Sequence, residues 1–139
     1  MKTNLALIGY GPHLKSLVLG IKLAHQRDID WYEDAKTGLE ATTREEYPLI
    51  FLNDVIAAGN SVLPEQIGLE DGLEMGCYLI GEIRKGINKK TPILVMHMFP
   101  PHKEKTAVRR YMDAGATECI NTFLLESSGD FEKIVGKYL

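Results

Sequence analysis

Apolar residues along the chain fall into two kinds of pattern that alternate from one end to the other. Short apolar runs, typical of buried strands, are each followed by a stretch in which apolar residues recur at helical spacing. The runs predict strands at 4–10, 28–32, 48–54, 91–98 and 116–124. The amphipathic stretches predict helices at 13–26, 34–46, 71–87, 100–115 and 127–139.

Local signals refine these elements. The runs at 48–54 and 91–98 are apolar almost throughout, as expected for central parallel strands covered on both faces. Asp71 is the expected N-cap of one helix and Gly115 the expected C-cap of another. The residues expected to face the core from the helices are Leu14, Leu17, Val18, Ile21, Ala35, Leu39, Thr42 or Thr43, Leu79, Ile80 and Ile83.

Five repeats of strand and helix predict a parallel sheet with helices on both faces. Right-handed crossovers give a doubly wound α/β domain over 1–139, a flavodoxin-like three-layer sandwich with strand order 2-1-3-4-5. In that order the carboxyl ends of strands 1, 3 and 4 meet at one edge of the sheet, where such folds place their chemistry. The residues expected there are 9–13, Asp54 and 97–100.

Composition narrows the class of protein. The net charge of -3 does not favour nucleic-acid or membrane binding, and no apolar stretch approaches the length of a membrane span. Cys77 and Cys119 show neither metal nor redox spacing, so we expect buried, reduced thiols in a cytoplasmic protein without a signal peptide. For a chain of 139 residues we also expect no attached output domain.

Several stretches together resemble the receiver domain of bacterial response regulators (CheY-like domains). They are "PLIFLND", "DGLEMGCYLIGEIRK", "TPILVMHM" and "YMDAGATECI", similar in order and spacing to the third strand, third helix, fourth strand and the turn into the fifth strand of that family. The resemblance spans essentially the whole chain. It implies a two-component signalling domain with Asp54 at the phospho-acceptor position.

The same resemblance implies other pocket residues, which this chain lacks. Receivers have two acids after strand 1 that hold Mg²⁺, a Thr or Ser ending strand 4, an aromatic on strand 5, and a Lys-Pro pair closing strand 5. The residues at these positions are Gly9, Tyr10, His97, Cys119, Thr122 and Phe123. Losing one group that stabilises the charge of a transition state typically costs about 3 to 4 kcal/mol, so phosphoryl transfer should be slowed by many orders of magnitude.

Histidines near this edge leave alternatives open. His97 either packs at a strand end or forms a hydrogen-bonded ion pair with Asp54, whereas His13 and His102 are interpreted as solvated residues of loops. An Asp-His-His zinc site is a further alternative, although its spacing matches no known metal signature. Lys103 is the one lysine expected nearby.

Two further features carry alternatives of their own. Gly9 and Gly11 follow a strand, but the third glycine of a dinucleotide fingerprint is replaced by Leu14, and Pro12 removes a donor. The segment 55–70 is about ten residues longer than a receiver's loop. It is either a lid over the former pocket or a neutral surface insertion.

The outer surface of the fourth helix, fifth strand and fifth helix is a common partner surface in receivers. The resemblance therefore makes Arg109, Arg110, Glu118 and Lys133 candidate contacts, and a solvated charged face is the alternative interpretation.

Together these observations predict a pseudo-receiver that acts by protein–protein interaction, without enzymatic activity or cofactor. Its partner is a signalling protein, such as a histidine kinase, or a second copy of the chain. One alternative is a divergent receiver that binds Mg²⁺ and is phosphorylated on Asp54. Another is a small nucleotide- or ligand-binding flavodoxin-like protein. We expect Asp54→Asn to leave the fold and the partner affinity nearly unchanged.

Overall fold

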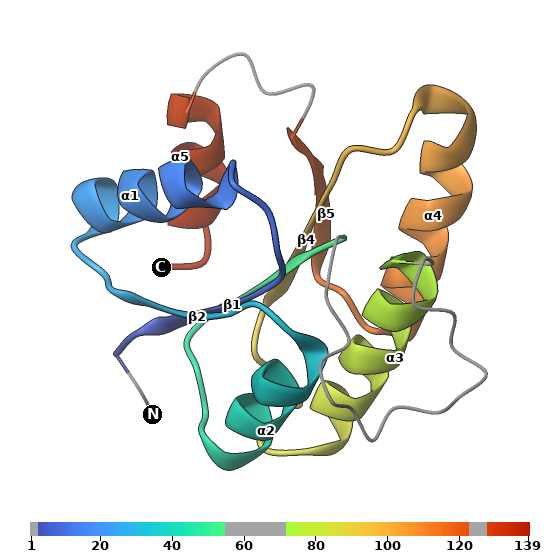
Figure 1. Ribbon diagram of the computed structural model, residues 1–139, viewed down its shortest axis with the longest axis horizontal. Coiled ribbons are helices and arrows are strands. Elements are labelled where there is room, and N and C mark those ends of the chain that lie inside the picture. Colours follow the sequence, from blue (N-terminus) through green and yellow to red (C-terminus); the bar gives the residue numbers. More distant parts are fainter. Residues whose placement is uncertain (1–2, 55–71, 123–127) are drawn as a thin grey trace.

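The computed structural model describes residues 3–54, 72–122 and 128–139, and its strands and helices alternate as the sequence predicts (Figure 1). The strands are β1 (Leu5–Ile8), β2 (Ile29–Tyr32), β3 (Ile50–Asn53), β4 (Ile93–His97) and β5 (Glu118–Asn121). The helices are α1 (Leu14–His25), α2 (Ala35–Arg44), α3 (Gly72–Lys85), α4 (Pro101–Ala114) and α5 (Ser128–Gly136). Each lies within a predicted range, with the ends trimmed.

The strands form one parallel sheet in the order β2-β1-β3-β4-β5, which confirms the predicted doubly wound topology. In Figure 1, α1 and α5 cover one face, and α2, α3 and α4 cover the other. Alternate residues of the strands point to opposite faces and divide the core in two. One half contains Ile8, Ile50 and Val95 with α2, α3 and α4, and the other contains Leu7 and Phe51 with α1 and α5.

Most of the expected core residues are buried, and the exceptions have local reasons. Leu17, Val18 and Leu39 are only partly buried, since they lie at the margins of their helix faces. Thr42 is buried and its hydroxyl donates to the carbonyl of Gly38, whereas Thr43 is exposed. The residue expected to cap α3, Asp71, lies outside the described residues.

The prediction for Gly115 is confirmed, whereas the prediction that both cysteines are buried is wrong. Gly115 ends α4 with a φ of 121°, a conformation that suits glycine, as predicted. Cys77 and Cys119 are free but only half-buried, because both lie at the margin of the core rather than inside it.

None of the described helices is long and apolar enough to cross a membrane.

Asn88 joins three segments at the amino-terminal edge of the sheet. Its Oδ1 accepts from the Tyr47 backbone N–H and the Thr91 hydroxyl, each at 2.9 Å. Its Nδ2 donates to the carbonyls of Thr42 and Glu45, at 2.6 and 2.8 Å. Because Asn88 is fully buried, water cannot replace these bonds. One side chain therefore fixes the end of α2, the approach to β3 and the approach to β4.

We expect Asn88→Ala to lower the free energy of unfolding by roughly 2–4 kcal/mol, because it leaves buried backbone groups unpaired. Urea denaturation measures the effect. The exposed neighbour Lys89 provides the control, since Lys89→Ala should change stability by less than about 0.5 kcal/mol. Equal effects of the two substitutions would contradict this role of Asn88.

Candidate functional site

Three strand ends place polar residues together at the carboxyl edge of the sheet. Asp54 directly follows β3, and its backbone N–H donates to the Met96 carbonyl at 3.0 Å. His97 ends β4, next to Asp54 on the neighbouring strand. The loop after β1 approaches the same edge, because the Asn53 side chain donates from Nδ2 to the Tyr10 carbonyl at 3.1 Å. The structure thus brings together the residues 9–13, Asp54 and His97.

Burial dominates the electrostatics of Asp54. The side chain is half-buried, and loss of solvation raises its pKa above the ordinary value for aspartate. The Met98 backbone N–H, which donates to the carboxylate, and the rings of His97 and His13 oppose this effect but do not reverse it. Asp54 is therefore easier to protonate than a solvated aspartate.

His97 is also shifted toward its neutral form. Its side chain is 1% exposed and lies beside the Phe99 ring, with ring centroids 5.4 Å apart. Burial lowers its pKa despite the nearby carboxylates of Glu104 and Asp54. Its Nδ1 accepts from the Phe99 backbone N–H at 3.4 Å, which leaves the ring proton on Nε2. The proposed ion pair with Asp54 is therefore not favoured, and His97 acts as a packed, neutral ring.

Gly9 occupies a position where a larger residue does not fit. Its φ is 153°, and a Cβ built there would lie 2.4 Å from the Cβ of Asn53. Its N–H is also engaged, donating to the Tyr32 carbonyl at 2.9 Å. An acid cannot be placed here without moving β1 or β3. The neighbouring Tyr10, by contrast, is 54% exposed and open to substitution.

Two further pocket positions, Cys119 and Thr122, are engaged within the fold, whereas Phe123 and the segment 55–70 lie outside the described residues. The Thr122 hydroxyl donates to the His97 carbonyl at 3.3 Å. Burial, with smaller contributions from Cys77 and Glu118, raises the pKa of Cys119 to about 12, so its thiol is a poor nucleophile. Asn121 donates to Glu104 Oε2 at 2.8 Å, a contact between β5 and α4.

Within the part of the chain that the structure describes, no lysine or arginine acts on Asp54. The side chains that lower its pKa are the imidazoles of His97 and His13. The segments 55–71 and 123–127, which follow β3 and Thr122 in sequence, contain no Lys, Arg or His. His102 and Lys103 are exposed on the first turn of α4. Residues 3–54, 72–122 and 128–139 contain no cluster of three potential metal ligands, which gives the zinc alternative no support.

The loop after β1 is not arranged as a phosphate cradle. The N–H groups of Leu14 and Lys15 already donate to the carbonyls of Gly11 and Pro12, at 3.2 and 3.3 Å. Beside this loop, Tyr10 and Trp31 help to line a hollow of about 260 Å³, slightly below the size typical of ligand sites. The nucleotide-binding alternative therefore gains no support from the backbone.

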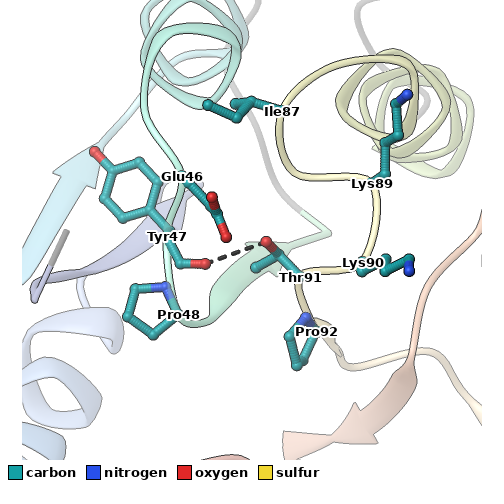
Figure 2. Close-up of a pocket in the computed structure, with 8 residues that line it drawn as sticks. All are labelled: Glu46, Tyr47, Pro48, Ile87, Lys89, Lys90, Thr91 and Pro92. Carbon is teal, nitrogen blue, oxygen red and sulfur yellow. Dashed lines mark hydrogen bonds between the residues drawn. The ribbon is translucent and has the colours of Figure 1, made fainter. Parts of the chain in front are cut away.

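A larger hollow, of about 520 Å³, lies at the opposite edge of the sheet (Figure 2). It is lined by Glu46, Tyr47, Pro48, Ile87, Lys89, Lys90, Thr91 and Pro92. Its polar floor is engaged, since the Thr91 hydroxyl donates to the Tyr47 carbonyl at 3.1 Å. The residues that line this hollow come before β3 and β4 in the chain, whereas Asp54 and His97 lie at the carboxyl ends of these strands. The hollow is therefore separate from the edge that contains Asp54.

Two of the four candidate partner residues are exposed, and the other two are already bound within the protein. Arg109 and Lys133 are exposed on α4 and α5. Arg110 does not lie on the outer face, because it forms an ion pair with Glu74 of α3 across the helix boundary. Glu118 accepts from the Tyr138 hydroxyl at 2.5 Å and lies 3.5 Å from Lys137 Nζ, so it is held by the carboxyl-terminal segment.

Sequence reasoning passed over several residues that shape this edge. Asn53 blocks the space beside Gly9, the Met98 N–H holds the Asp54 carboxylate, and Glu104 with Asn121 borders His97. A signal existed only for Asn53, a polar residue ending an apolar run.

No family profile and no curated protein matches the sequence, but solved structures do. A response regulator from Hahella chejuensis has 17% identity and a TM-score of 0.73, covering 99% of this chain and 96% of that one. The receiver domain of sensor histidine kinase PA1611 from Pseudomonas aeruginosa, with magnesium coordinated in its active site cleft, has 14% identity and a TM-score of 0.70, covering 99% and 98%. HP1043, an orphan response regulator of H. pylori, has 14% identity and a TM-score of 0.69, covering 99% and 97%. The chain thus has the receiver-domain fold, as the sequence resemblance implies.

Restoring an acid at position 9 should be harmful. We expect Gly9→Asp to lower the free energy of unfolding by roughly 2–4 kcal/mol, because its Cβ meets Asn53. Gly9→Ala should show most of the same loss, since the clash arises at the Cβ and not from the charge. Tyr10→Asp, at an exposed position, should change stability by less than about 1 kcal/mol. Thermal and urea denaturation measure all three, and a fully stable Gly9→Asp variant would refute the steric argument.

The raised pKa of Asp54 makes stability depend on pH. The folded state holds the Asp54 proton more tightly than the unfolded chain, so its free energy of unfolding falls as pH rises through that pKa. Asp54→Asn removes this loss, and we expect it to stabilise the protein at pH 7 by about 1 kcal/mol or less, with no advantage at pH 3. The exposed Asp113 supplies the control, Asp113→Asn. A destabilised Asp54→Asn variant at pH 7 would show that the carboxylate is favourably held.

Proposed function

We propose that this protein is a signalling module of the two-component type that works as a pseudo-receiver, binding a protein partner without phosphorylation of Asp54. One observation carries the proposal. At the edge where receivers gather charge, a half-buried acid stands beside a neutral, buried imidazole and a glycine that has no space for a second acid.

The chemistry of phosphoryl transfer supports this view. Its transition state spreads negative charge over several oxygens, and Mg²⁺ and cationic side chains stabilise that charge. Mg²⁺ requires near-octahedral oxygen coordination, for which Asp54 offers a single carboxylate, and burial raises the pKa of that carboxylate. The missing acid and the missing lysine would each have stabilised the transition state by about 3–4 kcal/mol. Without both, phosphoryl transfer should be slower by a factor of at least about ten thousand.

The partner is then recognised by shape and surface charge. The likeness to an orphan response regulator is compatible with a regulator that needs no dedicated kinase reaction. On the α4 and α5 surface, the exposed Arg109 and Lys133 remain candidate contacts for a signalling protein, such as a histidine kinase. No cofactor is required for binding of this kind, which takes place in the cytoplasm.

Phosphorylation assays separate this function from its rival. Incubation with Mg²⁺ and acetyl phosphate should add no phosphoryl group by intact-mass measurement, and the beryllofluoride mimic should leave the amide NMR spectrum unchanged. The Asp54→Asn variant is the matched control, and the two proteins should behave alike. A phosphoryl adduct present in the native chain and lost in Asp54→Asn would establish the alternative, a divergent receiver that uses Asp54.

A further inference from the structure

The hollow at the amino-terminal edge of the sheet is lined by charged side chains that the fold does not use (Figure 2). Glu46 is half-buried, and Lys89 and Lys90 are exposed. Within residues 3–54, 72–122 and 128–139, none of these three side chains forms a hydrogen bond or an ion pair. Lys85, at the nearby end of α3, is by contrast paired with Glu82 at 2.8 Å. The three charges of the hollow are therefore available to a ligand.

The backbone on both sides of the hollow is held in place without a ligand. Asn88 joins the two sides, because its Oδ1 accepts from the Tyr47 backbone N–H at 2.9 Å. One nitrogen of the Arg84 guanidinium donates to the carbonyls of Asn88, Lys89 and Thr91, at 3.0, 3.1 and 2.6 Å. The charged side chains thus project from a preformed frame, which lowers the entropic cost of binding.

The hollow also has an apolar wall. Ile87 is 51% exposed, and Pro48 and Pro92 line the hollow with it. In Figure 2 the Ile87 side chain extends toward the segment that carries Glu46. The volume of about 520 Å³ lies within the range of small-molecule sites. A ligand with an apolar side chain would remove Ile87 from water.

Opposite charges lie on the two sides of the hollow. In Figure 2 the Glu46 carboxylate points toward the loop that joins α3 to β4, and Lys89 and Lys90 extend from that loop on the side away from Glu46. Each lysine is exposed and has a flexible four-carbon stem, so its ammonium group can turn over the mouth of the hollow. A ligand therefore meets a carboxylate on one side and ammonium groups on the other.

We propose that this hollow binds a zwitterion, namely an α-amino acid or a short peptide with free ends and an apolar side chain. The ammonium group of the ligand donates to Glu46, and its carboxylate accepts from Lys89 or Lys90. Its apolar side chain covers Ile87. A dicarboxylate would place an anion against Glu46, and a polyamine would place a cation against the lysines, so neither is complementary to both sides.

An NMR titration with L-leucine tests the site. We expect saturable shifts of the amide resonances of Glu46 and Lys89, with none at Asp54. Glu46→Gln, and the double variant Lys89→Gln/Lys90→Gln, should each raise Kd at least about threefold, because each removes a charge that pairs with the ligand. These variants should fold, since the native side chains form no bond within the described residues.

Exposed residues of the same types on other helices provide the controls. Glu40→Gln on α2 and Lys105→Gln on α4 should leave the Kd for L-leucine unchanged. An equal loss of affinity in these controls would show that L-leucine responds to net charge and not to the hollow, and would overturn the proposal.

Capped ligands assign each end of the zwitterion to its side of the hollow. N-acetyl-L-leucine lacks the ammonium group, so it should bind more weakly than L-leucine, and Glu46→Gln should weaken it no further, because both changes remove the same contact. L-leucinamide lacks the carboxylate and should behave in the same way toward Lys89→Gln/Lys90→Gln. Losses that simply add would contradict these contacts.

A dipeptide distinguishes the two sources of the zwitterion. Tighter binding of L-leucyl-L-leucine than of L-leucine would identify a short peptide as the ligand, and weaker binding would identify a free amino acid. No saturable shift with either compound would overturn the proposal. The inference goes beyond the proposed function, because it concerns the opposite edge of the sheet from Asp54, and phosphorylation of Asp54 would leave it standing.

Discussion

A single close approach underlies this account: the backbone of Gly9 against the side chain of Asn53, where β1 and β3 leave the sheet. These two strands are neighbours, so their carboxyl ends define the crevice in which a fold of this kind places its chemistry. A Cβ at residue 9 would overlap the Cβ of Asn53, and the Asn53 amide is bonded to the next carbonyl along, that of Tyr10. Packing fills the space beside residue 9, so a substitution at residue 9 would not place an acid there without moving β1 or β3.

Burial then determines the chemistry of the groups that remain. It raises the pKa of Asp54 and lowers that of His97, and in each case it outweighs the nearby opposite charge. Burial thus makes Asp54 easier to protonate, and His97 harder to protonate, than the same groups in water.

The sequence predicted the helices and strands because these depend on the local spacing of apolar residues, which form the two halves of the core. It predicted the strand order because that order follows from the alternation of strands and helices. The position of Asp54 followed from the end of one apolar run. The contact of Gly9 with Asn53, the ion pair of Arg110 with Glu74, and the neutral state of His97 did not follow. Each joins residues far apart in the chain or depends on how deeply a group is buried, and neither quantity is visible in a local pattern.

We propose that this edge of the sheet holds too little charge to bind Mg²⁺. A titration with Mg²⁺, followed by NMR at the Asp54 carboxyl carbon and the amide of Met98, tests it most directly. We expect no saturable change at either nucleus across the millimolar range of Mg²⁺. A saturable shift at both, absent in a variant that replaces Asp54 by Asn, would contradict the account and return the protein to the phosphorylated class of receivers.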